Sequence, residues 1–193
     1  MKKLLALLLS LMLLLPAVSF AEAAESVDVY PVEFDDFILY VTSYDIIQKA
    51  AAKEEGQLLF MLYPAYDDAS LTHPNINGVW TAQDLAAALD DLDAAAFAQD
   101  VIDESVQGLT AQGIIATNPQ LISAEKVDGI MVLAYSMDMD YSGAGVDLQA
   151  TIYQMQFYIG LGEKGSYVFT LSAYNADDLI ALSEYVEAIE FKE

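Results

Sequence analysis

The chain contains 193 residues, of which 30 are acidic and only seven are basic, giving a formal net charge of −23. All seven basic residues are lysines, cysteine is absent, and His73 is the only histidine. This composition excludes nucleic acid as a partner, because phosphate recognition depends on clustered basic side chains, arginine above all. It also excludes thiol catalysis, disulfides and cysteine-ligated zinc.

The first 23 residues have the pattern of a secretory signal peptide. Two lysines precede an apolar run from Leu4 to Leu15, which Pro16 ends. The run is too short for the roughly 20 residues that a helix needs to cross a bilayer. Cleavage fits after Ala21 or after Ala23, and the A-x-A pattern favours Ala23. We therefore expect a signal peptide at 1–23 and a single secreted domain at 24–193, extracellular or, in a host with two membranes, periplasmic.

The charge of the expected mature chain bears on its partners. Cleavage after Ala23 leaves five lysines against 29 acidic residues, a net charge of −24. Such a charge keeps the protein soluble and repels anionic lipid, so no stable membrane anchor is expected after cleavage. The expected partner is an unidentified protein or small ligand, and it is not nucleic acid.

The first elements along the mature chain are short. Two strands are predicted at 29–34 and 37–41, around a tight turn. Ser43 is a candidate cap for a short helix that Gly56 would close. The nearly continuous apolar run at 57–63 is typical of a strand in the middle of a sheet that is covered on both faces.

Helical patterns follow in the middle of the chain. After a short strand at 75–80, Thr81 and Asp84 have the spacing of a capping box and predict an amphipathic helix. A second helix is predicted from Asp93, with Gly108 as its stop.

From Gly113 onward the pattern is mainly that of strands. Gly162 and Gly165 mark a hairpin turn, and Asn175 caps a last helix with an apolar stripe. The periodicity thus predicts an α+β fold with a mainly antiparallel sheet. The strands of this half are expected at 114–116, 120–123, 129–137, 148–159 and 167–173.

The element order resembles the α/β/α sandwich shared by the PsbP-like photosystem II extrinsic proteins and the Ran-binding nuclear-import factor. The likeness is sharpest over residues 148–193, in the strand Tyr153–Ile159, the glycine-bounded turn, the strand Tyr167–Ala173 and the helix that leads to Phe191. It implies an α/β/α sandwich with a mainly antiparallel central sheet. No functional motif of either family is matched, so the resemblance implies a fold and carries no function.

One loop has the opening of a calcium site. Oxygen-bearing side chains at positions one, three and five, followed by glycine at six, copy the first half of a calcium-binding loop. Position twelve is Gln149, where a bidentate acid is expected, so the alternative is a solvated hairpin loop. A weak calcium site is the only cofactor that the sequence suggests. Its ligands would be Asp138, Asp140, Ser142 and Asp147.

Aromatic residues offer a second candidate site. Most of the twelve tyrosines lie inside predicted strands, where a half-buried tyrosine is ordinary. Four stand near predicted loops or strand ends and would line a groove for a sugar or peptide. These are Tyr44, Tyr66, Tyr141 and Tyr174.

No catalytic constellation is specified. His73 follows Asp67 and Asp68, but no nucleophile elbow is present, and so many acids make chance carboxylate pairs inevitable. The sequence favours a secreted, acidic, non-enzymatic binding or interaction domain of unidentified ligand. The alternative is an extracellular hydrolase that acts through carboxylates. A pocket with two converging acids and a raised pKa would favour this alternative.

Overall fold

The computed structural model describes residues 28–65, 72–85, 88, 92–127 and 129–192. Within these ranges every paired strand runs antiparallel to its neighbour. The same part of the chain contains no helix with the length and apolar character needed to cross a membrane. The elements are β1 (Val29–Glu33), β2 (Phe37–Thr42), β3 (Ile46–Lys49), β4 (Leu58–Tyr63), β5 (Asn75–Thr81), α3 (Ala94–Ala111), β6 (Ile115–Val127), β7 (Ile130–Asp140), β8 (Gln149–Gly160), β9 (Ser166–Ala173), α4 (Ala176–Glu187) and β10 (Glu190–Phe191).

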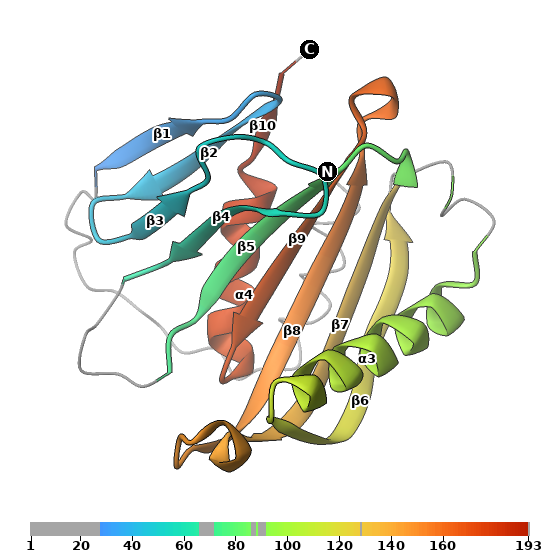
Figure 1. Cartoon of the computed structure of the whole chain (residues 1–193). Helices are drawn as coiled ribbons and strands as arrows, with labels where there is room; N and C mark the ends of the chain where they lie inside the picture. Colours follow the sequence, from blue (N-terminus) through green and yellow to red (C-terminus); the bar gives the residue numbers. More distant parts are fainter. Residues whose placement is uncertain (1–27, 66–71, 86–87, 89–91, 128, 193) are drawn as a thin grey trace, which may run out of the picture.

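The larger of two sheets has seven strands in the order β3-β4-β5-β9-β8-β7-β6. Strands β7, β8 and β9 form long hairpins, as the sequence predicts, and β5 joins them to the N-terminal strands (Figure 1). The turn from β8 to β9 requires glycine at Gly165, which has a φ of +85°. A Cβ atom there would lie 2.3 Å from the carbonyl oxygen of Thr81. The β8–β9 turn is thus packed tightly against the end of β5.

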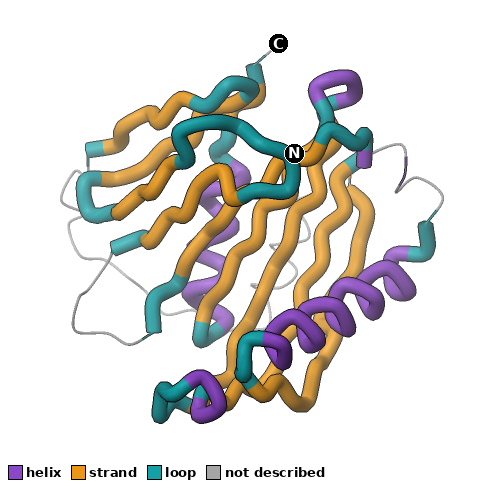
Figure 2. The backbone as a smooth tube through the Cα atoms, in the orientation of Figure 1, coloured by secondary structure: helices purple, strands orange, loops and turns teal. Residues whose placement is uncertain are grey.

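Helices α3 and α4 lie on opposite faces of this sheet (Figures 1 and 2). Helix α3 packs through Ala98 and Ile102 on the face that carries Tyr135 of β7. Helix α4 packs on the other face together with the smaller sheet, which has the order β1-β2-β10. Both helices begin at the predicted caps, since the side chain of Asp93 accepts hydrogen bonds from two backbone amides and that of Asn175 from one. The layers are those of the predicted α/β/α sandwich.

Aromatic rings fill the main core, between the larger sheet, the smaller sheet and α4. Phe37 lies at the centre, with ring centroids 5.2 Å from Tyr167 and 5.6 Å from Phe169. Gly78 of β5 makes room for this packing, because a Cβ atom there would lie 2.4 Å from the ring of Phe60. The core therefore constrains the backbone of β5 as well as the side chains around it.

The predicted helix after Ser43 is wrong, because the segment forms a turn and the edge strand β3. Asp45 builds the turn, accepting a hydrogen bond from the backbone amide of Thr42 over 2.6 Å. Ile46 and Ile47 then pair with β4. β-Branched residues favour an extended chain, and β4 offers them a partner strand.

Three further expectations need correction. Strand β4 is the second strand from an edge, and Leu58 at its start is exposed, so the run is not central. Helix α3 continues past Gly108 to Ala111, and Gly113, with a φ of +82°, follows its end. The two short strands expected around Pro119 are one strand, β6, with two shifts in its register to β7. An edge strand tolerates proline, because one side of it needs no hydrogen bonds.

The remaining expectations lie partly or wholly outside the described residues. The helix predicted from Thr81 falls on a stretch in which 86–87 and 89–91 are not described, although the amide of Ala88 donates a hydrogen bond to the carbonyl of Asp84. The signal peptide at 1–23 and Tyr66 also lie outside the described residues.

Candidate functional site

The face of the larger sheet that carries α3 has a group of uncharged polar side chains at its centre, which we call the polar face. Three adjacent strands, β5, β9 and β8, each contribute two of them. On each strand the two residues are separated by one apolar residue, so both point to the same side of the sheet. The polar face consists of Asn75, Asn77, Thr170, Ser172, Gln154 and Gln156.

The strand register arranges these residues in two rows. Asn75 lies opposite Ser172, which lies opposite Gln154. In the second row, Asn77 lies opposite Thr170, which lies opposite Gln156. Side chains directly opposite one another on neighbouring strands have Cβ atoms about 5 Å apart. The six side chains therefore form one continuous polar cluster, in which Ser172 and Gln156 are buried and the other four are half-buried.

The residues between them explain why the polar side chains point to this side of the sheet. Ile76 and Leu171 point to the opposite side and are fully buried in the main core. A shift of the strands by one residue would bring the polar side chains into that core, at a cost of several unpaired polar groups. The core thus fixes the orientation of the polar face.

Most polar-face side chains hydrogen-bond to neighbours. Gln154 donates to the hydroxyl of Ser172 over 2.9 Å, and Asn75 donates to the carbonyl oxygen of His73 over 3.3 Å. In the part of the chain that the structure describes, the side chains of Asn77 and Thr170 have no hydrogen-bond partner. Both are half-buried. Their polar atoms remain available to a ligand.

Gln156 is held by two tyrosines beneath α3. Its amide donates to the hydroxyl of Tyr135 over 3.1 Å, and the hydroxyl of Tyr158 donates to its carbonyl oxygen over 2.5 Å. Burial raises the pKa of both tyrosines, and for Tyr158 the neighbouring Tyr135 and Glu104 raise it further. Both hydroxyls therefore stay neutral at physiological pH, so this part of the face carries no charge.

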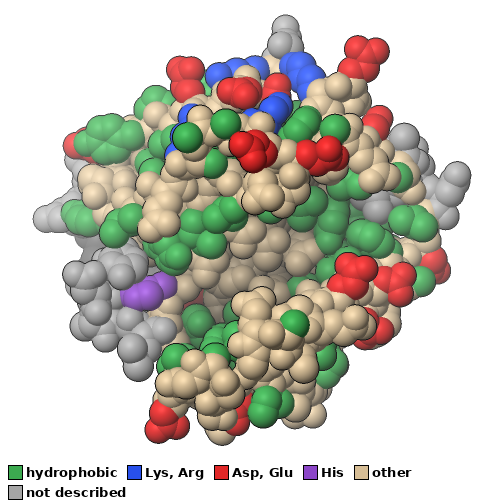
Figure 3. All heavy atoms as spheres, viewed as in Figure 1, with side chains coloured by type: hydrophobic (Ala, Val, Ile, Leu, Met, Phe, Trp, Pro, Cys, Tyr) green, Lys and Arg blue, Asp and Glu red, His purple; other side chains and the backbone are tan. Residues whose placement is uncertain are grey.

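The centre of this side of the molecule is hollowed and mostly uncharged (Figure 3). Acidic and basic side chains lie toward the rim of the view. At the side of β4, Tyr63 follows the buried Leu62 and therefore shares the face of the polar rows. Its ring meets that of His73 edge-on, with centroids 6.4 Å apart. His73 thus borders the polar face.

Two acids of the predicted calcium loop, Asp138 and Asp140, lie elsewhere, in an open groove of about 520 Å³ where β6 and β8 begin and β7 ends. Asp138 and Asp140 are two residues apart on strand β7, so they share one face of the sheet and precede the loop. Asp138 accepts hydrogen bonds from Asn118 and Thr151. We call this site the acidic groove.

Each carboxylate of the acidic groove is bound by neutral donors. Asp140 accepts from the backbone amide of Ser142 over 2.9 Å and from Gln149 over 3.0 Å. Hydrogen bonds from Asn118 and Thr151 lower the pKa of Asp138, and those from Ser142, with a smaller one from Gln149, lower the pKa of Asp140. Both acids are therefore ionised at neutral pH. The described residues contain no group of three or more His, Cys, Asp or Glu side chains arranged to hold a metal.

The proposed loop ligands Ser142 and Asp147 are exposed, in the connection between β7 and β8. A single 3-10 turn at Ser142–Ala144 opens this connection, and Gly145 ends the turn in the left-handed conformation. Calcium binding at Asp138, Asp140, Ser142 and Asp147 stays a prediction.

The structure brings two of the four candidate tyrosines together. Burial, followed by the effect of the neighbouring Tyr174, raises the pKa of Tyr141. Tyr44 is exposed in the turn between β2 and β3, at the far side of the sheet order from β7. The described tyrosines thus do not share one groove, and their role in ligand binding stays a prediction.

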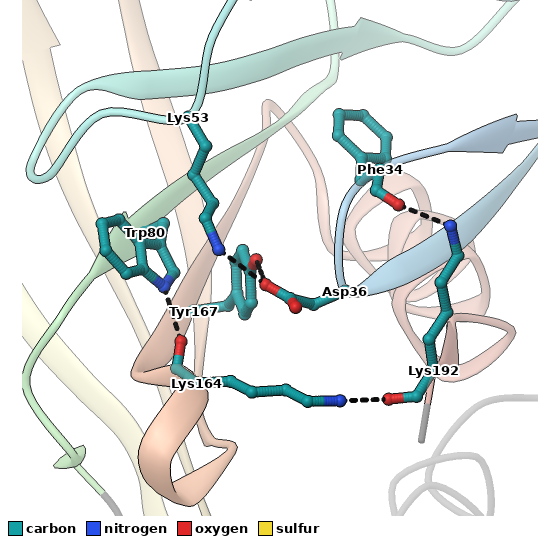
Figure 4. Close-up of polar contacts among 7 residues, drawn as sticks. All are labelled: Phe34, Asp36, Lys53, Trp80, Lys164, Tyr167 and Lys192. Carbon is teal, nitrogen blue, oxygen red and sulfur yellow. Dashed lines mark hydrogen bonds and ion pairs between the residues drawn. The ribbon is translucent and has the colours of Figure 1, made fainter.

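A cluster of lysines, which sequence reasoning missed, joins the loop after β1 to the larger sheet (Figure 4). Lys53 forms an ion pair with Asp36 over 2.7 Å and lies 4.4 Å above the ring of Trp80. The hydroxyl of Tyr167 donates to the same oxygen of Asp36 over 2.6 Å. Burial acts to raise the pKa of Asp36, but these two hydrogen bonds and the charge of Lys53 outweigh it and lower the pKa.

The other lysines of this cluster bind backbone carbonyls. Lys192 donates to the carbonyl oxygen of Phe34 over 2.7 Å, and Lys164 donates to that of Lys192 over 2.8 Å. Lys49 donates to the carbonyl oxygen of Glu33. Because these ammonium groups have intramolecular partners, we interpret the cluster as structural. The cluster consists of Lys49, Lys53, Lys164 and Lys192.

The polar face was also missed, although the sequence contains a signal for it. Three strands carry the same triplet, an apolar residue between two uncharged polar ones, at 75–77, 154–156 and 170–172. What no single strand shows is that the three triplets lie side by side, because β5 pairs with β9 across about a hundred residues of chain.

Comparisons with known proteins show the fold. No family model matches the chain, and no curated protein matches its sequence. The solution structure of cyanobacterial PsbP (CyanoP) from Synechocystis sp. PCC 6803 matches with a TM-score of 0.50 and 10% identity, over 91% of this chain and 98% of that one. The crystal structure of LpqN, involved in cell envelope biogenesis of Mycobacterium tuberculosis, matches with a TM-score of 0.43 and 14% identity, over 88% and 93% of the two chains. This chain has the PsbP-like α/β/α fold, which confirms the resemblance seen in the sequence.

Proposed function

We propose that this chain is an exported, non-catalytic binding domain that holds its ligand on the polar face. The observation that carries the proposal is the pair Asn77 and Thr170, which lie opposite each other on neighbouring strands and are half-buried, with polar atoms that no described residue uses. Because both side chains are only half-buried, their polar atoms reach solvent, and a ligand can replace the water there without breaking a hydrogen bond within the protein. Polar groups without a partner among the described residues support a role in binding.

The electrostatics of the acidic groove support binding over hydrolysis. A carboxyl that acts as a general acid near neutral pH needs a raised pKa. Asp138 and Asp140 have lowered pKa values, because neutral donors bind both carboxylates. These acids hold their charge and are poor proton donors, which disfavours the hydrolase alternative.

A fragment screen tests the site while the ligand is still unidentified. The protein, labelled with nitrogen-15, is mixed with small neutral, anionic and cationic fragments, and amide shifts are followed by NMR. We expect the fragments that bind to shift amides at 75–77, 154–156 and 170–172. Neutral fragments that gather instead in the acidic groove would refute the polar face as the binding site.

Export is tested separately, by sequencing the N-terminus of the protein recovered outside the cell. The small residues before the cleavage region predict a mature chain that starts between Glu22 and Glu25. Recovery of the chain with an intact Met1 in the membrane fraction would refute export by a cleaved signal peptide.

A further inference from the structure

We infer that the ligand of the polar face is a neutral carbohydrate. This inference rests on the binding function proposed above and names its ligand class. It follows from three properties of the face, namely the kinds of polar group that it offers, the absence of charge and the strands that carry it.

The polar face offers the groups that match sugar hydroxyls. An amide side chain has two N–H donors and a carbonyl acceptor, and a hydroxyl both donates and accepts. Each sugar hydroxyl likewise donates and accepts, so Asn77 and Thr170 together satisfy two neighbouring hydroxyls of one ring. The two rows are about 7 Å apart along the strands, a span that the hydroxyls of a single pyranose ring bridge. The polar face therefore matches a sugar ring both in the kinds of polar group that it offers and in their spacing.

Charge excludes most other classes of small ligand. None of the six residues of the polar face is ionisable, and the tyrosines that hold Gln156 stay neutral. A charged ligand would lose its hydration here without gaining an opposite charge. The net charge of −23 opposes anionic ligands further. A neutral polar ligand is the class that remains.

The position of the face in the sheet distinguishes a sugar from a peptide. Extended peptides commonly bind by adding a strand to a sheet edge, where backbone groups are free. Strands β5, β9 and β8 are paired on both sides, so their backbone groups are already used. Only side chains meet the ligand. The ring of Tyr63, at the border of the face, adds an apolar surface suited to the C–H side of a sugar ring.

The test is an NMR titration of the labelled protein with neutral tetrasaccharides of glucose and N-acetylglucosamine, and with tetragalacturonate as an acidic counterpart. We expect at least one neutral sugar to shift the amides at 75–77, 154–156 and 170–172 in a saturable manner at about 10 mM, as for a Kd in the millimolar range. Asn77→Ala and Thr170→Val should each weaken binding by about 2- to 10-fold, the loss of one neutral hydrogen bond. Thr170→Val keeps the shape of the side chain, and the dispersion of the spectrum reports folding independently of binding.

Thr110→Val is the matched control, since Thr110 lies on α3 with its hydroxyl bound to the carbonyl of Val106. It should bind as the unchanged protein does. If fragments bind the polar face but no neutral sugar shifts its amides, the carbohydrate inference fails and the binding site stands. If neither fragments nor sugars shift these amides, both proposals fail. Equal binding of tetragalacturonate, or unchanged affinity in both polar-face variants, would also overturn the inference.

Discussion

Tyr167 donates its hydroxyl proton to Oδ2 of Asp36 over 2.6 Å, and this bond joins residues 131 positions apart in the chain. Tyr167 belongs to β9 of the larger sheet, and Asp36 to the turn between β1 and β2 of the smaller one. Lys53 donates to the same oxygen. The bond therefore ties the two sheets together at the end of the aromatic core.

We predict that Asp36→Asn destabilises the protein by about 1.5–3 kcal/mol at neutral pH, the range for hydrogen bonds to a charged group. The pKa of Asp36 is lowered in the folded state, so its contribution is present above the unfolded-state pKa and is lost as the pH falls through the folded-state value. Urea unfolding across this acidic range should show a smaller pH dependence in the variant. Asp35→Asn, next to it and exposed, is the control and should leave the free energy of unfolding nearly unchanged.

The contribution of Glu187, on α4, to stability should depend on pH in the opposite direction to that of Asp36. Burial, with a contribution from Glu184, raises its pKa, and its Oε1 atom is buried without a hydrogen-bond partner in the described structure. The ionised form is therefore unfavourable in the folded state, and stability from this group increases as the pH falls through the raised pKa. Glu187→Gln should raise the melting temperature at neutral pH and have little effect at acidic pH. The exposed Glu184 contributes only the smaller part of the effect, so Glu184→Gln should give a smaller gain, and an equal gain in both variants would contradict a specific role for Glu187.

Gly78→Ala should destabilise the protein by about 1–3 kcal/mol, the cost of overpacking a core. The new methyl group would meet the rings of Phe60 and Phe169, both fully buried. Gly108→Ala is the matched control, because a Cβ atom there meets no atom within 4 Å and the site is helical. Alanine should stabilise the helix by about 0.5–1 kcal/mol. Melting temperatures that change in the same direction in both variants would contradict this account.

Calcium binding, if present, should be weak, with a Kd of about 10⁻⁴–10⁻³ M as in extracellular calcium modules. Only Asp138, Asp140 and Asp147 offer carboxylates, and two of these already accept hydrogen bonds from neutral donors. Calcium should raise the melting temperature more than magnesium does, and Asp140→Ala should remove the difference. Equal effects of the two metals would show that ions gather around the acidic chain without a specific site.

The sequence was most informative where local chemistry decides the structure. The caps of α3 and α4 depend on Asp93 and Asn175, whose side chains bind amides two or three residues away. The hairpin of β8 and β9 likewise depends on glycines in its own turn. Residues this close in sequence meet in almost any fold. Their pattern alone is therefore sufficient to predict a helix cap or a hairpin turn.

The local sequence pattern gave wrong or incomplete predictions where a partner far away in the sequence determines the structure. The segment at 46–49 has helical features, but pairing with β4 makes it a strand. Long-range pairing also creates the polar face, since Asn77 and Thr170 meet only because β5 lies beside β9. The candidate site could therefore not be assembled from sequence spacing. The metal hypothesis, which rests on neighbouring residues, and the tyrosine hypothesis, which rests on predicted loops and strand ends, pointed to other parts of the molecule.

Strand β6 forms one edge of the larger sheet, and its irregularities bear on behaviour at high concentration. Pro119 has no amide hydrogen, Asn118 adopts a φ of +50°, and the register shifts twice along the strand. A second copy of the protein approaching this edge would find only short runs of backbone groups in line. The strand thus protects a sheet with exposed apolar residues, Leu121 and Ile122 among them, against the growth of intermolecular β-structure.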